Sequence, residues 1–301
     1  MPDISASLHL LDATFFLYPS PEHAEKGACF GGTGVIIGVP VKSRPNILMT
    51  YAVTNWHVAC RDGLSVIRLK SRNGEIHILD KDPSEWTFLP GKQDLAATPI
   101  RLPRPDGAPP SIVPTTLFIG HGEKSECHVG DDVFMVGRFV DFDGQETNRP
   151  ATRFGTISML DAPIRQPTNF CGHSVVVDMH SRAGFSGSPV FVYRPSFASV
   201  LTTPIKHAGV LPSIGQVPSY RTWGAGNHTE VRLLGILWGQ FPEQWEINSK
   251  VAPAQGEASL VTEGSFVRGF SGMSCVIPAC QISELLDHPD LKSVRDAPIG
   301  T

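Results

Sequence analysis

Residues 183–192 read Ala-Gly-Phe-Ser-Gly-Ser-Pro-Val-Phe-Val, and this stretch decides the fold that we predict for the 301-residue chain. Glycines on both sides of Ser186 allow a tight turn, because glycine adopts backbone conformations that other residues avoid. Such a turn exposes the Ser186 hydroxyl and lets the N–H groups of Gly184 and Ser186 point at one spot, as an oxyanion hole requires. An ordinary Gly/Ser turn before an apolar strand has the same composition, so a functional interpretation needs partners elsewhere in the chain.

A serine hydroxyl becomes a good nucleophile beside a neutral histidine that a carboxylate orients. His57 follows the apolar run 51–53 and the pair Thr-Asn, which sets it apart from most of the 11 histidines. Asp94 opens the apolar run 95–97, where a carboxylate can be partly buried and directed at a partner. Three other aspartates compete for this role but stand in charged or turn-like stretches: Asp62, Asp80 and Asp82. We therefore predict Ser186 as nucleophile, His57 as general base and Asp94 as the acid that orients the histidine.

Short apolar runs rich in β-branched residues, separated by many of the 29 Gly and 26 Pro, predict an all-β protein. We expect strands at 34–41, 47–53, 64–69, 76–79, 132–136, 174–177, 189–192 and 232–237. The one convincing helical pattern covers 279–287. A Pro-rich stretch, 102–114, resembles a linker, so we predict an N-terminal β domain over 1–110 and a C-terminal one over 111–301. The irregular segment 193–229 is long enough to be a functional loop.

Composition narrows the possible partners. The formal net charge is −4 and the Lys and Arg are dispersed, which argues against a nucleic-acid surface. No apolar run is long enough to span a membrane, and residues 1–18 contain no Lys or Arg, so we expect no membrane contact, no signal peptide and a cytoplasmic location. The six cysteines form no C-x-x-C pair and are interpreted as scattered reduced thiols; we expect no metal and no other cofactor.

Taken together, these sequences resemble the trypsin/chymotrypsin-like serine peptidases, and most closely the bacterial HtrA-like branch without a PDZ domain. The resemblance is carried by the order of three motifs and by the strands around them: Thr54-Asn55-Trp56-His57-Val58, Asp94-Leu95-Ala96, Gly184-Phe185-Ser186-Gly187-Ser188-Pro189, Gly32-Thr33-Gly34 and Gly235-Ile236-Leu237-Trp238-Gly239. It implies two six-stranded antiparallel β-barrels with a short C-terminal helix. It also implies hydrolysis of peptide bonds in a protein or peptide substrate through an acyl-enzyme, without a cofactor.

The same resemblance suggests residues that bind substrate. Leu237, Trp238 and Gly239 correspond to the strand that pairs with an extended peptide, and His180 lies at the base of the primary pocket. Because His180 is no carboxylate, we expect a preference for small or medium apolar side chains. Phe185 stands where digestive relatives carry an aspartate that binds a newly cut N-terminus, so activation by that route is not expected. Whether Cys29 and Cys60 pair stays open.

Two alternatives remain. Gly-Phe-Ser-Gly recurs at 269–272, but Ser271 follows the Leu237–Gly239 strand and lacks the Ser-Pro and apolar strand that come after Ser186. The chain could also be a catalytically silent or latent form of the fold, which binds a protein segment and is regulated by a partner protein. In the latent form, segment 193–229 would act as a lid.

Overall fold

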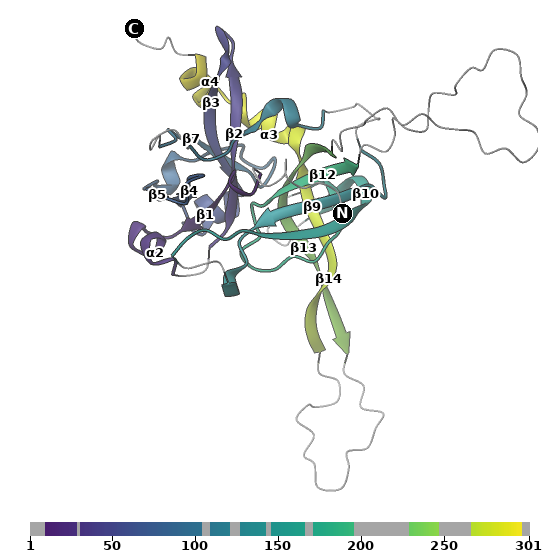
Figure 1. Ribbon diagram of the computed structural model, residues 1–301. Coiled ribbons are helices and arrows are strands. Elements are labelled where there is room, and N and C mark those ends of the chain that lie inside the picture. The colour runs from purple at the N-terminus through teal and green to yellow at the C-terminus, as the bar shows by residue number, and fades with distance from the viewer. Residues whose placement is uncertain are drawn as a thin grey trace, which may run out of the picture.

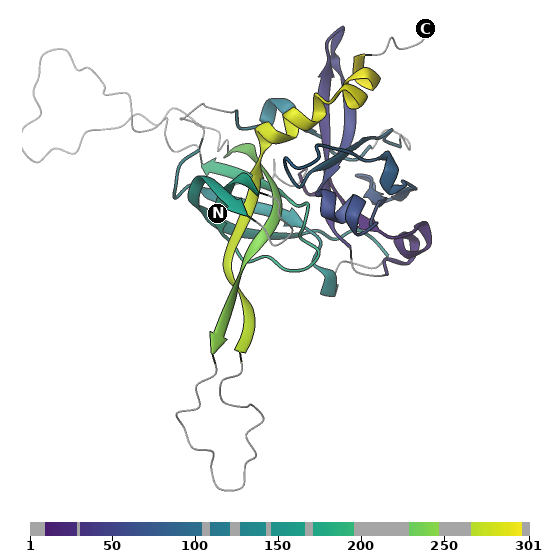
Figure 2. The same ribbon diagram turned by 180° about the vertical axis from the view of Figure 1, so that it is seen from behind.

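Two β units lie side by side in the computed structural model, as Figure 1 shows. The structure describes residues 10–28, 31–103, 109–120, 127–142, 146–165, 171–195, 229–246 and 266–296. The first unit contains the N-terminal strands, and the second contains the strands from β9 onward. Two C-terminal helices run from the second unit back toward the first, which is clearest from behind in Figure 2.

The first unit is an eight-stranded sheet. Its main path is β5-β4-β1-β2-β3-β7-β6, and the short β8 pairs in parallel with β2. The strands are β1 (Thr14–Tyr18), β2 (Thr33–Val41), β3 (Arg44–Thr54), β4 (Val66–Lys70), β5 (Ile76–Leu79), β6 (Thr87–Phe88), β7 (Ala96–Pro99) and β8 (Val113–Pro114). A short helix, α2 (Pro21–Lys26), follows β1. Apolar side chains from several strands fill the interior, including Phe15, Ile36 and Ile67, all fully buried.

The second unit is a closed barrel of six antiparallel strands in the order β10-β11-β14-β13-β12-β9. Its strands are β9 (Asp132–Gly137), β10 (Ala151–Arg165), β11 (Cys171–Asp178), β12 (Pro189–Pro195), β13 (Thr229–Glu246) and β14 (Phe266–Pro278). Closure leaves no sheet edge inside the barrel, which satisfies the backbone hydrogen bonds of its core strands. Strands β13 and β14 are long and continue past the barrel as a two-stranded ribbon (Figures 1 and 2).

A shared apolar core joins the two units. Buried side chains of the first unit, such as Val53, pack in one cluster with side chains of the second, such as Ile236 and Ile277. Helix α3 (Ala279–Leu286) follows β14 directly and adds Leu285 to this cluster, and α4 (Pro289–Asp296) adds Leu291. Burying one such side chain contributes about 1.5–3 kcal/mol. The relative position of the two units is therefore fixed by packing rather than by a loose linker.

The expected all-β class with a short C-terminal helix is confirmed. Each of the eight expected strands overlaps a strand of the structure, and the helix at 279–287 is α3. The six-stranded antiparallel barrel describes the second unit, whereas the first has eight strands, seven on a path from β5 to β6 and β8 beside β2. Within the described residues, no helix has the length and apolar character needed to cross a bilayer.

Part of the expected linker, 102–114, belongs to the first sheet. Its last residues form β8, and a single 3-10 turn, Thr115–Leu117, then leads to Phe118, which bridges to Leu233 of the second unit. The main chain therefore passes from one unit to the other over about one turn after β8. The segment 193–229 lies largely outside the described residues.

Candidate active site

His57 and Asp94 meet at the edge of the first unit. Strand β3 ends at Thr54, and a π-helical turn, His57–Arg61, begins at the histidine itself. Such turns are rare and occur often at functional sites. Asp94 Oδ2 lies 2.5 Å from His57 Nδ1, and Asp94 Oδ1 accepts the backbone N–H of His57 at 2.8 Å. The side chain of Asn55 donates to the backbone oxygen of Asp94 at 2.9 Å, which fixes the loop that carries the carboxylate.

The burial of this pair determines which ring nitrogen can act. The Asp94 side chain is 1% exposed, whereas the His57 side chain is 17% exposed. Because a carboxylate only accepts, the nitrogen that faces it, Nδ1, carries the proton. The other nitrogen, Nε2, then presents a lone pair and can accept a proton from a nucleophile. This is the arrangement that general-base catalysis needs.

Ser186 lies in the tight turn that its glycines predict. Phe185 N–H donates to Arg182 O at 3.2 Å, and Gly184 has φ = +93°. A positive φ at the third position distinguishes a type II turn from type I and favours glycine there. Ser188 N–H donates to Phe185 O at 3.0 Å, and Gly187 again has a positive φ of +86°. Both glycines therefore occupy positive-φ positions, which favour glycine over other residues.

Thr33 of β2 connects this turn to the first unit. Its backbone N–H donates to Ser186 O at 2.8 Å, and its hydroxyl donates to Gly184 O at 2.7 Å. The same hydroxyl accepts the backbone N–H of Arg138 at 2.8 Å, so both of its hydrogen-bonding roles are filled. Thr33 O accepts the hydroxyl of Thr54, which is close to His57 in sequence. Thr33 is fully buried and thus contacts the histidine strand and the serine turn at once.

The atoms around Gly32 show how closely the serine turn and the histidine turn approach each other. A Cβ atom at Gly32 would lie 2.6 Å from Val58 Cγ1 and 3.1 Å from Ser186 O. Val58 follows His57 directly, so the serine turn and the histidine turn contact the same small residue. Among the described residues, no hydrogen bond joins Ser186 Oγ to His57. Catalytic hydrogen bonds are often long without substrate and tighten when substrate binds.

Phe185 fixes the serine turn by burial. Its ring is fully buried in a core cluster of the barrel, together with Met135 and Val190. The guanidinium of Arg153 lies 5.1 Å from the ring centroid, an attractive cation–π arrangement.

The predicted substrate strand adjoins the serine turn through its backbone. Gly187 N–H donates to Leu237 O at 3.0 Å, and Leu237 N–H donates to Ser188 O at 2.9 Å. Pairing of β13 with β12 stops at Ile236, whereas Gly239 still pairs with Cys275 of β14. Beyond Ile236, the strand pairs recorded for β13 within the described residues are with β14.

The other two predicted substrate contacts differ in their side chains. Trp238 is 4% exposed, and its Nε1 donates to Ser174 Oγ at 3.0 Å, so this ring packs inward. His180 is exposed and lies against Gly272, where an added Cβ would come within 2.9 Å of its ring. Substitution of Gly272 would therefore displace the His180 ring.

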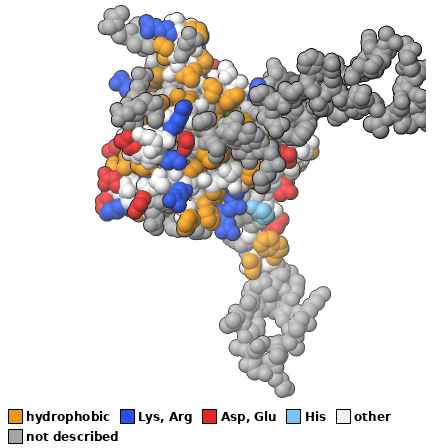
Figure 3. Space-filling model, in the orientation of Figure 1, with side chains coloured by type: hydrophobic (Ala, Val, Ile, Leu, Met, Phe, Trp, Pro, Cys, Tyr) orange, Lys and Arg blue, Asp and Glu red, His pale blue; other side chains and the backbone are white. Residues whose placement is uncertain are grey.

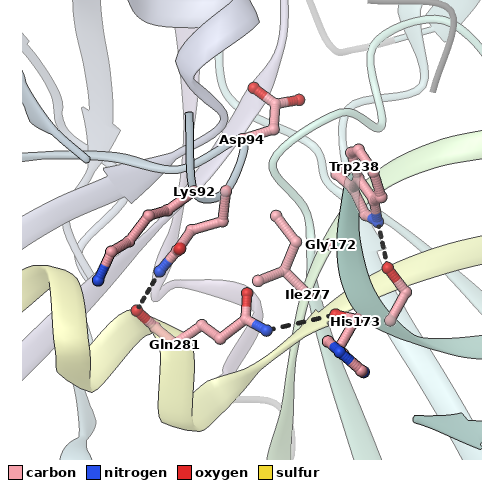
Figure 4. A pocket seen from close by; sticks show the side chains of 9 residues that line it. Lys92, Asp94, Gly172, His173, Trp238, Ile277 and Gln281 are labelled. Atoms are coloured by element: carbon pink, nitrogen blue, oxygen red, sulfur yellow. Dashed lines mark hydrogen bonds between the residues drawn. The ribbon is translucent and has the colours of Figure 1, made fainter. Parts of the chain in front are cut away.

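The loop that carries Asp94 is also bound to α3, a contact that sequence reasoning did not predict. Figure 4 shows this region, where residues of both units and of α3 line a small pocket. The amide of Gln93 donates to Gln281 O at 3.2 Å, and Gln281 donates to His173 O at 3.3 Å. An ion pair joins Lys92 to Glu284. Helix α3 thus connects the Asp94 loop to β11.

Two competing nucleophiles are disfavoured. Burial and the nearby charge of Asp94 raise the pKa of the Cys60 thiol to about 11, so it is protonated at neutral pH and is a poor nucleophile. The hydroxyl of Ser271 accepts the backbone N–H of Met273 at 3.1 Å within β14. Its Gly-Phe-Ser-Gly neighbours therefore form a strand irregularity rather than an exposed turn. Cys60 is a free thiol, and Cys29 lies outside the described residues.

Within the described ranges, no three side chains among His, Cys, Asp and Glu are grouped to bind an ion. Among the described residues, the ionisable partner of His57 is one buried carboxylate, Asp94. Both of its oxygens already contact His57.

Comparison with known proteins gives a limited result. The sequence matches no protein-family model and no curated protein. Similar solved structures include the apo MamO protease domain from Magnetospirillum magneticum, with 14% identity, a TM-score of 0.43 and coverage of 93% of this chain and 98% of that one. The HtrA-type protease AlgW with a decapeptide has 18% identity, a TM-score of 0.44 and coverage of 85% and 52%. Deg5 has 16% identity, a TM-score of 0.40 and coverage of 62% and 78%. Since these scores lie below 0.5, function has to be argued from this chain's own residues.

Proposed function

We propose that this chain is a serine endopeptidase with a trypsin-like arrangement of Ser186, His57 and Asp94. The observation that carries the proposal is the buried Asp94 carboxylate bonded to His57 Nδ1, in a chain whose Thr33 bonds the Ser186 turn to the same unit. A carboxylate that orients a histidine next to a serine in a glycine turn is the constellation used for acyl transfer.

The proposed reaction follows from these positions. Ser186 Oγ attacks the carbonyl carbon of the scissile bond while its proton passes to His57 Nε2. The carbonyl oxygen becomes an oxyanion that accepts the N–H groups of Gly184 and Ser186. Collapse of this intermediate expels the amine, which takes the proton from His57, and leaves an ester on Ser186. Water then gives a proton to His57 and attacks the ester carbonyl; the bond to Ser186 Oγ breaks, His57 returns the proton to Oγ, and the carboxylic acid product leaves. Asp94 stabilises the histidine cation throughout.

A fluorophosphonate probe tests the proposal directly, because it phosphonylates activated serines. We expect labelling of the wild-type chain and none of Ser186→Ala. The matched control is Ser271→Ala, which removes the serine of the second Gly-Phe-Ser-Gly sequence and should be labelled like the wild type. Persistent labelling of Ser186→Ala, or no labelling of the wild type, would refute an active peptidase that uses this serine.

A silent or latent form of the same fold is the second candidate. It is favoured by the lack of a hydrogen bond between Ser186 Oγ and His57 among the described contacts. In this form a regulatory partner, or displacement of segment 193–229 as a lid, would complete the site. Deletion of 196–228 should then raise basal probe labelling, and unchanged labelling would count against a lid.

The specificity and the domain division are also proposals. We propose that His180 borders a pocket for small or medium apolar side chains, since it provides no carboxylate for Lys or Arg. A peptide-library cleavage profile tests this preference, and cleavage after basic residues would contradict it. We retain two β domains divided near residue 110, with β8 added to the first because it pairs with β2.

A further inference from the structure

The loop that carries Asp94 contacts α3 through the two residues that precede the aspartate. Gln93 is 6% exposed, and its side-chain Nε2 donates to the backbone oxygen of Gln281 at 3.2 Å. Lys92 forms an ion pair with Glu284, about one turn further along the helix. In Figure 4, Asp94 and Lys92 come from the loop and Gln281 from the helix below it. Asp94 therefore follows directly after two contacts with α3.

Leu95, on the other side of Asp94, packs in the same core as the helix. It is fully buried in one apolar cluster with Leu285 of α3. Both neighbours of Asp94 in the chain are thus fixed where α3 packs, one by a hydrogen bond and one by apolar burial. The carboxylate between them contacts His57 through both of its oxygens. A shift of the main chain just before Asp94 would therefore move the carboxylate relative to the histidine ring.

The helix is anchored independently of this loop. The side chain of Gln281 donates to His173 O on β11 at 3.3 Å, and α3 buries Ile282 in the core that joins the two units. A backbone carbonyl has two lone pairs, so Gln281 O can accept the amide of Gln93 in addition to an N–H of its own helix. Gln93 therefore bonds an acceptor whose position is set by the packing of the second unit.

We propose that Gln93 is a positioning residue of the triad, which holds Asp94 at His57 Nδ1 through its hydrogen bond to α3. The inference rests on the proposed function, although the contact between His57 and Asp94 can be measured without cleavage. Catalytic groups must be placed accurately, since a displacement of about 1 Å can lower a rate about 10²-fold. When the carboxylate moves away, part of the His57 population carries its proton on Nε2. That tautomer cannot accept the proton of Ser186.

Replacement of Gln93 by methionine tests the hydrogen bond. Methionine is unbranched, apolar and similar in length to glutamine, so it fills the same buried space without a donor. We expect kcat of Gln93→Met on a short peptide to be about threefold to tenfold lower, which is the net worth of one hydrogen bond expressed as a rate. KM should not change, because Gln93 is almost fully buried and offers little surface to a substrate. Wild-type kcat, or a loss that appears in KM alone, would overturn the proposal.

The tautomer of His57 gives a readout that a merely structural role would not move. In chains labelled with ¹⁵N at histidine, long-range ¹H–¹⁵N spectra distinguish a protonated ring nitrogen from a bare one, and His57→Asn identifies the signals of this ring. At a pH where the ring is neutral, we expect the proton on Nδ1 in the wild type and a mixture of both tautomers in Gln93→Met. Unchanged ring nitrogens combined with a lower urea midpoint would assign Gln93 to stability alone and overturn the proposal.

Lys92→Met is the matched control, because it breaks another contact between the same loop and the same helix. The ion pair is exposed, at 59% for Lys92 and 47% for Glu284, and exposed pairs contribute little. Figure 3 shows acidic and basic side chains interspersed over the first unit on the face that it draws, so the loss of one charge changes the overall field little. We expect wild-type kcat and one tautomer. Impairment equal to that of Gln93→Met would overturn the assignment to Gln93.

The spectra also separate this inference from the proposed function, because they require neither cleavage nor probe labelling. A wild type that cleaves no peptide, combined with a change of tautomer in Gln93→Met, would refute the peptidase and keep the positioning role. Cleavage by the wild type, combined with one tautomer in both chains, would keep the peptidase and refute the role of Gln93. A wild type without the proton on His57 Nδ1 would overturn both.

Discussion

Replacement of Thr33 by valine should disable the serine turn without removing any group that touches substrate. Valine has nearly the shape of threonine but no hydroxyl, so it leaves the carbonyl of Gly184 and the N–H of Arg138 without their bonds to Thr33 Oγ1. A buried polar group left unsatisfied costs about 1–3 kcal/mol. The turn can regain a partner for Gly184 by leaving its type II geometry, which would turn the Gly184 N–H away from the oxyanion.

The size of the expected loss in kcat depends on how much of this cost the turn relieves by changing its geometry. If about 1.4–2.8 kcal/mol of the penalty is relieved by turn rearrangement, kcat falls about 10- to 100-fold. Loss of a complete oxyanion donor gives about 10²–10³-fold, which sets the upper limit. Thr33→Ser keeps the hydroxyl and should stay close to wild type. The comparison of Val with Ser therefore isolates the two hydrogen bonds from the packing of the side chain.

The assay measures kcat on a short peptide, normalised to the fraction of enzyme that a fluorophosphonate titrates, together with the inhibition constant of a peptide aldehyde. The aldehyde forms a tetrahedral adduct whose oxygen uses the oxyanion hole, so its affinity should fall by the same factor as kcat/KM. A general loss of stability would lower the urea midpoint, but it would leave kcat per titrated active site and the inhibition constant unchanged. Wild-type kcat in Thr33→Val, or equal impairment in Thr33→Ser, would refute the reasoning.

Three further predictions concern the same region. Asp94→Asn should lower kcat about 10⁴-fold with little change in KM, because the amide favours the wrong tautomer of His57; stopped-time peptide assays measure it, and a loss below tenfold would contradict the role. Gly184→Ala should abolish probe labelling, because its Cβ would lie 2.4 Å from Val140 Cγ2 at a φ of +93°; retained labelling would argue against the turn. Burial raises the pKa of the Cys275 thiol to about 11, so the folded state holds this proton above the roughly 8.5 of an exposed thiol. Stability should therefore fall as pH rises from about 8.5 to about 11, because the unfolded chain releases the proton first; urea midpoints that stay flat over this range, or fall equally in Cys275→Ala, would contradict it.

The sequence allowed the strands and the local turn chemistry to be predicted because both depend on near neighbours. Runs of β-branched residues between glycines and prolines correspond to β2, β3 and β9, and the glycines around Ser186 do adopt positive φ. Local context also led to Asp94 as the partner of His57 over three nearer aspartates, which stand in charged or turn-like stretches. The predicted roles of these residues in catalysis stay predictions until the probe experiment is done.

The missed features all depend on contacts between distant residues. Thr33 bonds Gly184 across 151 positions, and nothing in Gly-Thr-Gly indicates where its hydroxyl points. Strand β1 (Thr14–Tyr18) is not among the expected strands, although it lies in the middle of the first sheet. The link from α3 to the Asp94 loop joins Gln93 to Gln281 across 188 positions. Such contacts follow from how the two units pack, which local periodicity does not encode.

The position of β14 in the closed barrel has a consequence for the newborn protein. β14 leaves the ribosome after the other described strands, yet it lies between β11 and β13 in the barrel. Until it arrives, β13 has no partner on that side and α3 cannot reach the loop of Asp94. A half-made chain would therefore carry all three residues of the proposed triad without the scaffold that aligns them. The order of translation would therefore keep the proposed peptidase inactive until β14 and α3 have been made, which protects the nascent chains on the same polysome from cleavage.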